Sequence, residues 1–304
     1  MHLERLRLSH RTPRRQGDWL WQLGRMDAWH DRALADAGHF DIWVPTPWAK
    51  EALLGGDTGG DGGGLSWSAQ DRADLPAWIP VSAGLSAFRR AQQADGPDRP
   101  WQWQAHGAWK LSRTRWGLSL AQGDVRDQGT PTATVGSAAH SHGALDCRQS
   151  LAQRVCFTGH QTRLALSAQW QSPSQPWQAL GVWVQARQRG ELSTRDAVVD
   201  WRSLTSGGWA QLTHAFAPGW QAGVRHEWLH VDQRLSGPGA TLLAREAGLS
   251  PDSAPQRVAL VLSQQFRHHW QWGVELGRQQ GRGLADGSYG LLRLSWQPGV
   301  VWSR

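Results

Sequence analysis

Residues Trp101–Lys110 read Trp-Gln-Trp-Gln-Ala-His-Gly-Ala-Trp-Lys, and this stretch decides the fold. Apolar or small residues occupy every second position from Trp101 onward, whereas glutamine, histidine and lysine fill most positions between them. Because side chains of a β-strand alternate between two faces, the stretch predicts a strand with one apolar and one polar face.

The same alternation recurs along the whole chain. Many of the segments that carry it run for about 10 residues, the length that a tilted strand needs to cross a bilayer. The candidate strands are 3–9, 19–25, 64–70, 79–90, 101–110, 116–124, 161–170, 177–188, 207–216, 220–231, 256–266, 270–280 and 288–297.

The composition excludes several classes of protein. The 304 residues include 22 Trp, 5 Phe and 1 Tyr, which argues against a disordered chain. No apolar run approaches the roughly 18 residues of a membrane-spanning helix. The formal net charge is +7, but the basic residues are scattered arginines with only two lysines, Lys50 and Lys110, which argues against nucleic-acid binding.

Strands of this kind occur in soluble sandwiches and in transmembrane barrels. Tryptophans near the ends of the predicted strands suit the aromatic girdles of a barrel. The connections also alternate in length, as in outer-membrane barrels with short periplasmic turns and longer external loops. Short connections are expected at 111–114, 171–176, 217–219 and 267–269, and long ones at 125–160, 189–206 and 232–255.

We therefore predict an all-β protein, a transmembrane antiparallel up-and-down β-barrel in the Gram-negative outer membrane. Residues 1–304 form one domain, with 125–160 as a long extracellular loop. About 13 strands are visible, and about 14–16 are expected in the complete barrel because such barrels have even strand numbers. Met1 is not followed by an apolar signal segment, so we expect an N-terminally truncated chain, with a miscounted strand as the alternative.

Several short segments resemble bacterial outer-membrane porins, namely the phosphate-selective-porin-like proteins and related porin-like barrels. The matching segments are 19–25 (WLWQLGR), 28–30 (AWH), 52–64, 207–212 (GGWAQL) and 219–227 (GWQAGVRHE). The resemblance implies that the segment Met26–Gly63 folds into the lumen as a constriction, with Gly59–Gly64 as its flexible return. Its candidate lining residues are Trp29, His30, Arg32, His39, Trp43 and Trp48. The alternative is that 26–63 forms an external loop.

Basic residues dominate the face that the alternation assigns to the lumen. The expected anion-selecting residues are Lys110, Arg115, Arg163, Arg187, Arg225, Arg257 and Arg293. Guanidinium groups in a water-filled pore favour anions and offer bidentate contacts to phosphate or carboxylate. The alternative is that Glu227 and Glu275 on the same face form salt bridges with some of these arginines.

Cys147 and Cys156 lie in the longest predicted loop, and two cysteines in an oxidising compartment indicate a local disulfide. A zinc site with His140, His142 and His160 is the weaker alternative, because the spacing matches no recognised pattern.

We thus expect a porin for passive diffusion of small, anionic solutes, without a catalytic site, a metal or a cofactor. Outer-membrane lipid and small solutes are the expected partners, a homotrimer is the candidate assembly, and no nucleic acid is expected. The alternatives are a barrel for polysaccharide export or surface attachment, and a secreted, Trp-rich, carbohydrate-binding β-sandwich.

Overall fold

The computed structural model describes most of the chain. The described residues are 6–14, 17–27, 42–43, 45–54, 59–69, 76, 78–90, 100–129, 156–173, 176–194, 197–246, 249, 252–266, 270–282 and 286–296. No helix among them is long and apolar enough to cross a membrane.

The described residues form a single sheet of 13 antiparallel strands, each paired with its neighbours in the sequence. This confirms the predicted all-β, up-and-down architecture, and the alternative of a two-sheet sandwich is wrong. The strands are β1 (Leu6–Arg14), β2 (Gly17–Asp27), β3 (Gly59–Ser68), β4 (Ser82–Arg90), β5 (Gln102–Leu111), β6 (Thr114–Gly129), β7 (Cys156–Gln171), β8 (Trp177–Ser193), β9 (Val198–Ala217), β10 (Trp220–Ser236), β11 (Asp252–Phe266), β12 (Trp270–Arg282) and β13 (Gly287–Trp296).

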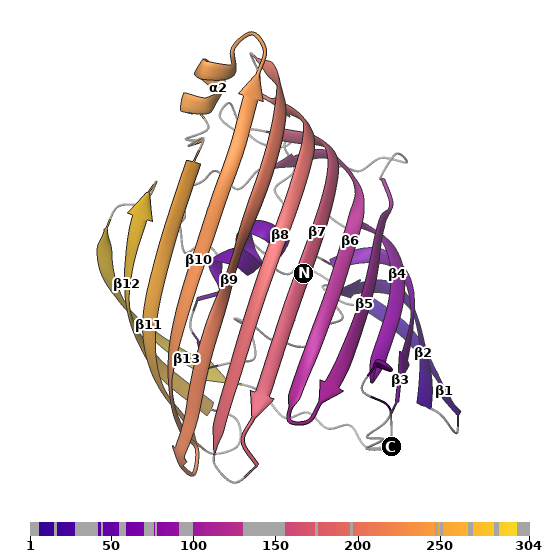
Figure 1. Ribbon diagram of the computed structural model, residues 1–304, viewed down its shortest axis with the longest axis vertical. Coiled ribbons are helices and arrows are strands. Elements are labelled where there is room, and N and C mark those ends of the chain that lie inside the picture. The colour runs from indigo at the N-terminus through magenta and orange to yellow at the C-terminus, as the bar shows by residue number, and fades with distance from the viewer. Residues whose placement is uncertain are drawn as a thin grey trace.

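The sheet curves strongly, so that β1–β4 and β11–β13 curl away behind β6–β10 (Figure 1). A short helix, α2 (Ala240–Glu246), lies at the end of β10, and a π-helical turn, η1 (Lys50–Leu54), lies inside the curve. Among the described residues β1 pairs only with β2, and β13 only with β12.

The outer face of the sheet is apolar and ends in aromatic residues at the short turns. Leucines and valines such as Leu260, Leu276 and Leu292 are exposed there, as expected for side chains that face lipid. At the start of β8 and β10 and the end of β9, aromatic rings follow one another around the barrel. This aromatic belt comprises Trp177, His214, Phe216, Trp220 and Trp272, with neighbouring ring centroids 4.2 to 6.4 Å apart.

Strands β8 and β9 run for 17 and 20 residues, so the predicted long loop at 189–206 is wrong. The strands continue past the level of the apolar outer band because their inner faces form a second small core there. Leu192, Val199 and Trp201 pack in this core with Leu243 of α2. The connection between β8 and β9 therefore shrinks to 194–197.

The glycine-rich run Gly59–Gly64 forms the first part of β3, so the prediction of a flexible return is also wrong. Glycine is needed at the inward-pointing position Gly62 because the backbone of the neighbouring strand β4 lies too close for a side chain there. A Cβ on Gly62 would lie 2.1 Å from the Ala87 carbonyl oxygen and 2.5 Å from the Phe88 Cα. A Cβ on Gly63, which points to the outer face, would meet only ordinary contacts at 3.4 Å or more.

We expect Gly62→Ala to lower the free energy of unfolding by about 1–3 kcal/mol, because the added methyl overlaps the backbone of β4. Gly63→Ala is the matched control, one residue away in the same strand, and its effect is expected to be within about 0.5 kcal/mol. Urea unfolding of the refolded barrel in lipid vesicles measures the change in the free energy of unfolding for both variants. Equal effects of the two substitutions would contradict the close approach of β3 and β4.

Candidate functional site

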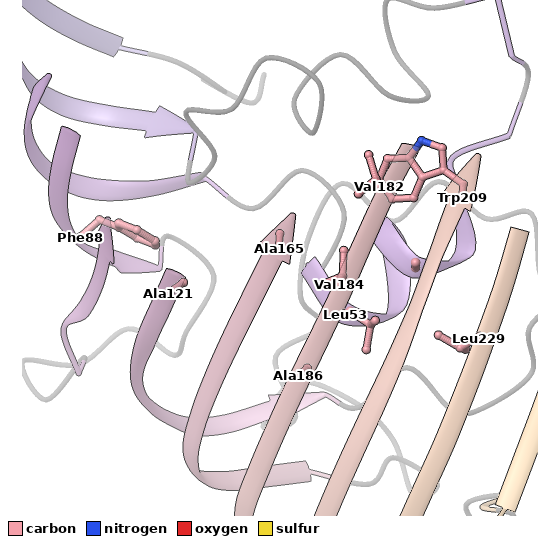
Figure 2. Packing of buried hydrophobic residues seen from close by; sticks show 10 residues of the cluster. Leu53, Phe88, Ala121, Ala165, Val182, Val184, Ala186, Trp209 and Leu229 are labelled. Atoms are coloured by element: carbon pink, nitrogen blue, oxygen red, sulfur yellow. The ribbon is translucent and has the colours of Figure 1, made fainter. Parts of the chain in front are cut away.

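A segment of the β2–β3 connection lies against the inner face of the opposite wall of the barrel. We call residues 42–43 and 45–54 the inner segment. Ala49 and Leu53 pack on an apolar patch of β8–β10 formed by Val182, Val184, Ala186, Trp209 and Leu229 (Figure 2). Ile42 and Trp43 pack on Ala259 and Val261 of β11. The inner segment therefore connects β2 and β3 with strands on the far side of the sheet.

Next to this patch, four charged side chains lie buried on the inner face of β10, β11 and β12. The Arg257 guanidinium donates to both carboxylate oxygens of Glu227, with Nη2–Oε distances of 2.6 and 2.7 Å. The Arg225 Nε lies 2.7 Å from Glu227 Oε1, and its Nη2 lies 3.7 Å from Glu275 Oε1. Tyr289 donates its hydroxyl to Glu275 at 2.8 Å. Two arginines and two glutamates thus balance each other's charge.

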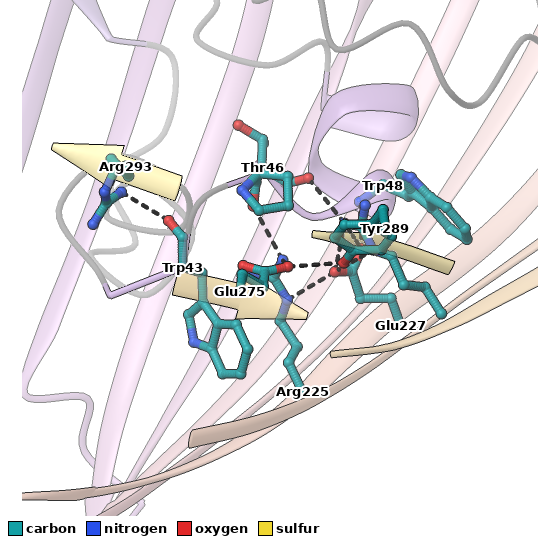
Figure 3. Close-up of polar contacts among 10 residues, drawn as sticks. Trp43, Thr46, Trp48, Arg225, Glu227, Glu275, Tyr289 and Arg293 are labelled. Atoms are coloured by element: carbon teal, nitrogen blue, oxygen red, sulfur yellow. Dashed lines mark hydrogen bonds and ion pairs between the residues drawn. The ribbon is translucent and has the colours of Figure 1, made fainter. Parts of the chain in front are cut away.

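This charged cluster binds the backbone of the inner segment (Figure 3). Arg225 donates to the Pro45 carbonyl at 3.1 Å, and Glu227 accepts the Trp48 backbone N–H at 2.9 Å. From β13, Arg293 donates to the Trp43 carbonyl at 2.8 Å.

Two tryptophans of the inner segment cover the guanidinium groups of the cluster. The Arg225 guanidinium carbon lies 4.5 Å from the Trp43 ring centroid, and that of Arg257 lies 4.5 Å from the Trp48 centroid. Cation–π contacts of this kind are stronger where water is excluded, and both tryptophans are buried. The segment is thus fixed by hydrogen bonds, ring contacts and apolar packing together.

The structure corrects the expectation that all these arginines face a water-filled pore. Arg225 and Arg257 are 0% and 6% exposed, and both are ion-paired. The salt-bridge alternative therefore describes this part of the inner face, where Glu227 is ion-paired with both Arg225 and Arg257. Since a bidentate guanidinium–carboxylate pair fixes geometry as well as charge, the arrangement positions a chain segment.

Arg187 lies on the outer face, so its prediction as a lumenal residue is wrong. Its neighbour Ala186 pairs with Arg163 on β7 and is buried on the inner face, whereas Arg187 itself is exposed. The apolar residues Val182 and Val184 on β8 face inward because the inner segment packs on them. An apolar inner face is the reverse of the usual barrel pattern, so the alternation predicts the wrong lumenal face for β8.

Three further predicted basic residues lie on the inner face. Lys110 and Arg115 are cross-strand partners at the short-turn end, and both are exposed. Arg163 is buried and donates to Gln161 at 2.9 Å.

Polar side chains line the inner face around Arg163, and we call this surface the polar wall. It comprises Ser86, Gln102, Gln104, Ser119, Gln161 and Ser167, all buried. The Gln104 amide and the Ser119 hydroxyl make no hydrogen bond to the described residues, although both side chains are buried.

The remaining predicted residues are the other constriction candidates, the two cysteines and the histidines of the zinc alternative. Trp29, His30, Arg32, His39 and Cys147 lie outside the described residues, as do His140 and His142 of the zinc alternative. Cys156 opens β7 and is disulfide-bonded. His160 is on the outer face, where it contacts Asp124 at 3.0 Å, and no metal-binding cluster occurs in the described part of the chain.

Comparison with known proteins supports the fold. A loop L8 deletion mutant of OmpT, an outer membrane protein of Vibrio cholerae, is similar in structure, with a TM-score of 0.51 and 10% sequence identity. The likeness covers 93% of this chain and 80% of that one. OmpT of Vibrio cholerae expressed in the outer membrane gives a TM-score of 0.45 at 10% identity, over 90% and 70% of the two chains.

No protein-family model and no curated protein matches the sequence. The fold, with its apolar outer band and aromatic belt, is that of a protein of the Gram-negative outer membrane.

Proposed function

We propose that this protein is an outer-membrane pore for the passive diffusion of small solutes, related to the phosphate-selective-porin-like barrels. The observation that supports the proposal is the inner segment, which is held on the inner face of β8–β11 and by Arg293 of β13. We infer that a segment folded inward in this way narrows the interior of the barrel. A chain segment folded inward is the usual device by which a barrel pore limits the size of the solutes that pass. No enzymatic step is part of this proposal.

The proposal includes a preference for anions. Arg225 and Arg257 contribute little, because Glu227 and Glu275 balance their charge. The preference then comes mainly from Lys110 and Arg115, which are exposed at the short-turn end. Basic residues still outnumber acidic ones on the described inner face, so counter-anions concentrate there.

The alternative of polysaccharide export is less well supported. It would need aromatic rings presented to sugar on the inner face. The described inner-face aromatics Phe88, Phe157, Trp201 and Trp209 are instead buried in apolar clusters, and Tyr289 donates its hydroxyl to Glu275.

Lys110→Gln combined with Arg115→Gln is expected to reduce the anion-to-cation permeability ratio about twofold, because two neighbouring charges leave the mouth of the pore. The matched control is Arg187→Gln with Arg278→Gln, which removes two exposed charges from the outer face and should leave the ratio unchanged. Reversal potentials across a planar bilayer under a KCl gradient measure the permeability ratio of each protein. Cation preference in the unmodified protein would contradict the proposed selectivity, and absence of conductance would contradict the pore.

A further inference from the structure

Three arginines lie side by side on the outer face, beyond the apolar band. Arg189 on β8 is the cross-strand partner of Arg202 on β9, which is in turn the partner of Arg234 on β10. The same row continues on β7 and β6 with His160 and Asp124. We call Arg189, Arg202 and Arg234 the arginine row.

The arginine row has no counter-charge bound to it within the described part of the chain. All three side chains are exposed, and no ion pair or hydrogen bond joins them to a described residue. Like charges placed directly opposite each other on neighbouring strands destabilise a sheet. We therefore expect an anion from outside the protein to offset the repulsion between the three neighbouring arginines.

The height of the arginine row places it at the level of lipid head groups. The row lies 12 to 14 residues along β8, β9 and β10 from Trp177, Phe216 and Trp220 of the aromatic belt. At about 3.3 Å per residue and a strand tilt of about 40°, this is roughly 30–35 Å. An outer apolar band is about 25 Å tall, so the row lies just beyond its far edge.

Other charges share this part of the outer face. Arg187 lies two residues nearer the aromatic belt than Arg189 and adds a fourth guanidinium. Asp232 lies two residues nearer the belt than Arg234. Glu191 and Asp200 are cross-strand partners in the next row away from the membrane. The basic residues thus lie between the apolar band and the acidic pair, at the height where lipid phosphates lie.

We propose that the arginine row is a binding site for the phosphate groups of the outer-leaflet lipid, the phosphorylated glycolipid of Gram-negative bacteria. Guanidinium groups bind phosphate oxygens through two parallel hydrogen bonds each. Three neighbouring strands at about 4.8 Å spacing spread the guanidinium groups over about 10 Å or more, enough to contact two phosphates of one head group. Basic surface patches beside a membrane recognise lipid head groups in the same manner. The site depends on the position of the barrel in the membrane and not on the proposed pore.

The test is binding of purified diphosphorylated lipid A to the refolded, full-length protein in detergent, measured by native mass spectrometry. Arg189→Gln, Arg202→Gln and Arg234→Gln together are expected to weaken binding at least about tenfold. The control removes the same number of charges from other exposed positions, as Arg14→Gln, Arg113→Gln and Arg245→Gln, and is expected to bind like the unmodified protein.

Enzymatically dephosphorylated lipid A separates recognition of phosphate from general binding of acyl chains, and it is expected to bind equally weakly to all three proteins. Equal binding of the diphosphorylated lipid by the arginine-row variant and the unmodified protein would overturn the proposal. Equal loss in the control variant would overturn it as well, because net charge alone would then explain binding. Bilayer conductance of the arginine-row variant is expected to be unchanged, so failure of the lipid site and failure of the pore are distinguishable.

Discussion

Glu227→Gln is expected to lower the free energy of unfolding by about 3–5 kcal/mol, the usual cost of breaking a buried ion pair. Glu227 accepts hydrogen bonds from Arg257 and from the Trp48 backbone N–H, and it lies beside the Arg225 guanidinium. A glutamine side chain offers only one acceptor oxygen and no charge. Arg257 would lose its carboxylate partner, and Arg225 would keep only Glu275, at 3.7 Å.

Urea unfolding in lipid vesicles checks this expectation, with Glu191→Gln as the matched control. Glu191 is also a glutamate on a strand, but it is exposed on the outer face, so its substitution should change the free energy of unfolding by no more than about 0.5 kcal/mol. A small effect at Glu227 would mean that water replaces the carboxylate and that the charged cluster does not stabilise the barrel.

The strands were predictable because alternation is a local property of the sequence. Each of the 13 predicted strands overlaps one strand of the structure, from 3–9 with β1 to 288–297 with β13. The predicted strand 101–110, which corresponds to β5, illustrates why the alternation locates the strands. Trp103 faces outward and is exposed, whereas Gln104 faces inward and is buried, as two-residue alternation in a barrel requires.

The errors arise where distant parts of the chain meet. Val182 and Val184 look like lipid-facing residues, but they face inward because Ala49 and Leu53 pack on them from a segment more than a hundred residues away in sequence. The glycines of β3 look like a loop, but they make room for Phe88 of the next strand. Both features depend on tertiary packing, which a local pattern does not contain.

The candidate site was found only in part for the same reason. The sequence predicts Trp43 and Trp48 as lining of a constriction, and Arg225 and Arg257 as anion-selecting residues of the lumen. The structure brings these four residues together as two cation–π pairs. Tyr289 and Trp209 were missed, since no sequence signal links a single tyrosine or tryptophan to a buried charge or to a packed segment on the far wall.

Deletion of residues 42–54 is expected to raise the single-channel conductance at least about twofold, because the deletion removes the segment that we propose narrows the interior. The deletion is compatible with the sheet, since Asp27 at the end of β2 pairs directly with Gly59 at the start of β3. The remaining residues 28–41 and 55–58 are more than the few that a hairpin connection needs. After the deletion, the two arginines and two glutamates of the charged cluster remain in the barrel wall and still balance each other's charge.

A separate pair of variants tests whether anchoring, rather than the presence of the segment, sets the conductance. Trp48→Ala removes the ring under the Arg257 guanidinium, whereas Trp101→Ala removes a ring with a similar contact, 4.6 Å from the Arg89 guanidinium carbon, on the outer face. If an anchored segment narrows the path, Trp48→Ala increases the current fluctuations of the open channel and Trp101→Ala leaves them unchanged. An unaltered conductance after deletion of 42–54 would instead show that solutes pass along the polar wall without meeting the segment, and the constriction would have to lie elsewhere in the barrel.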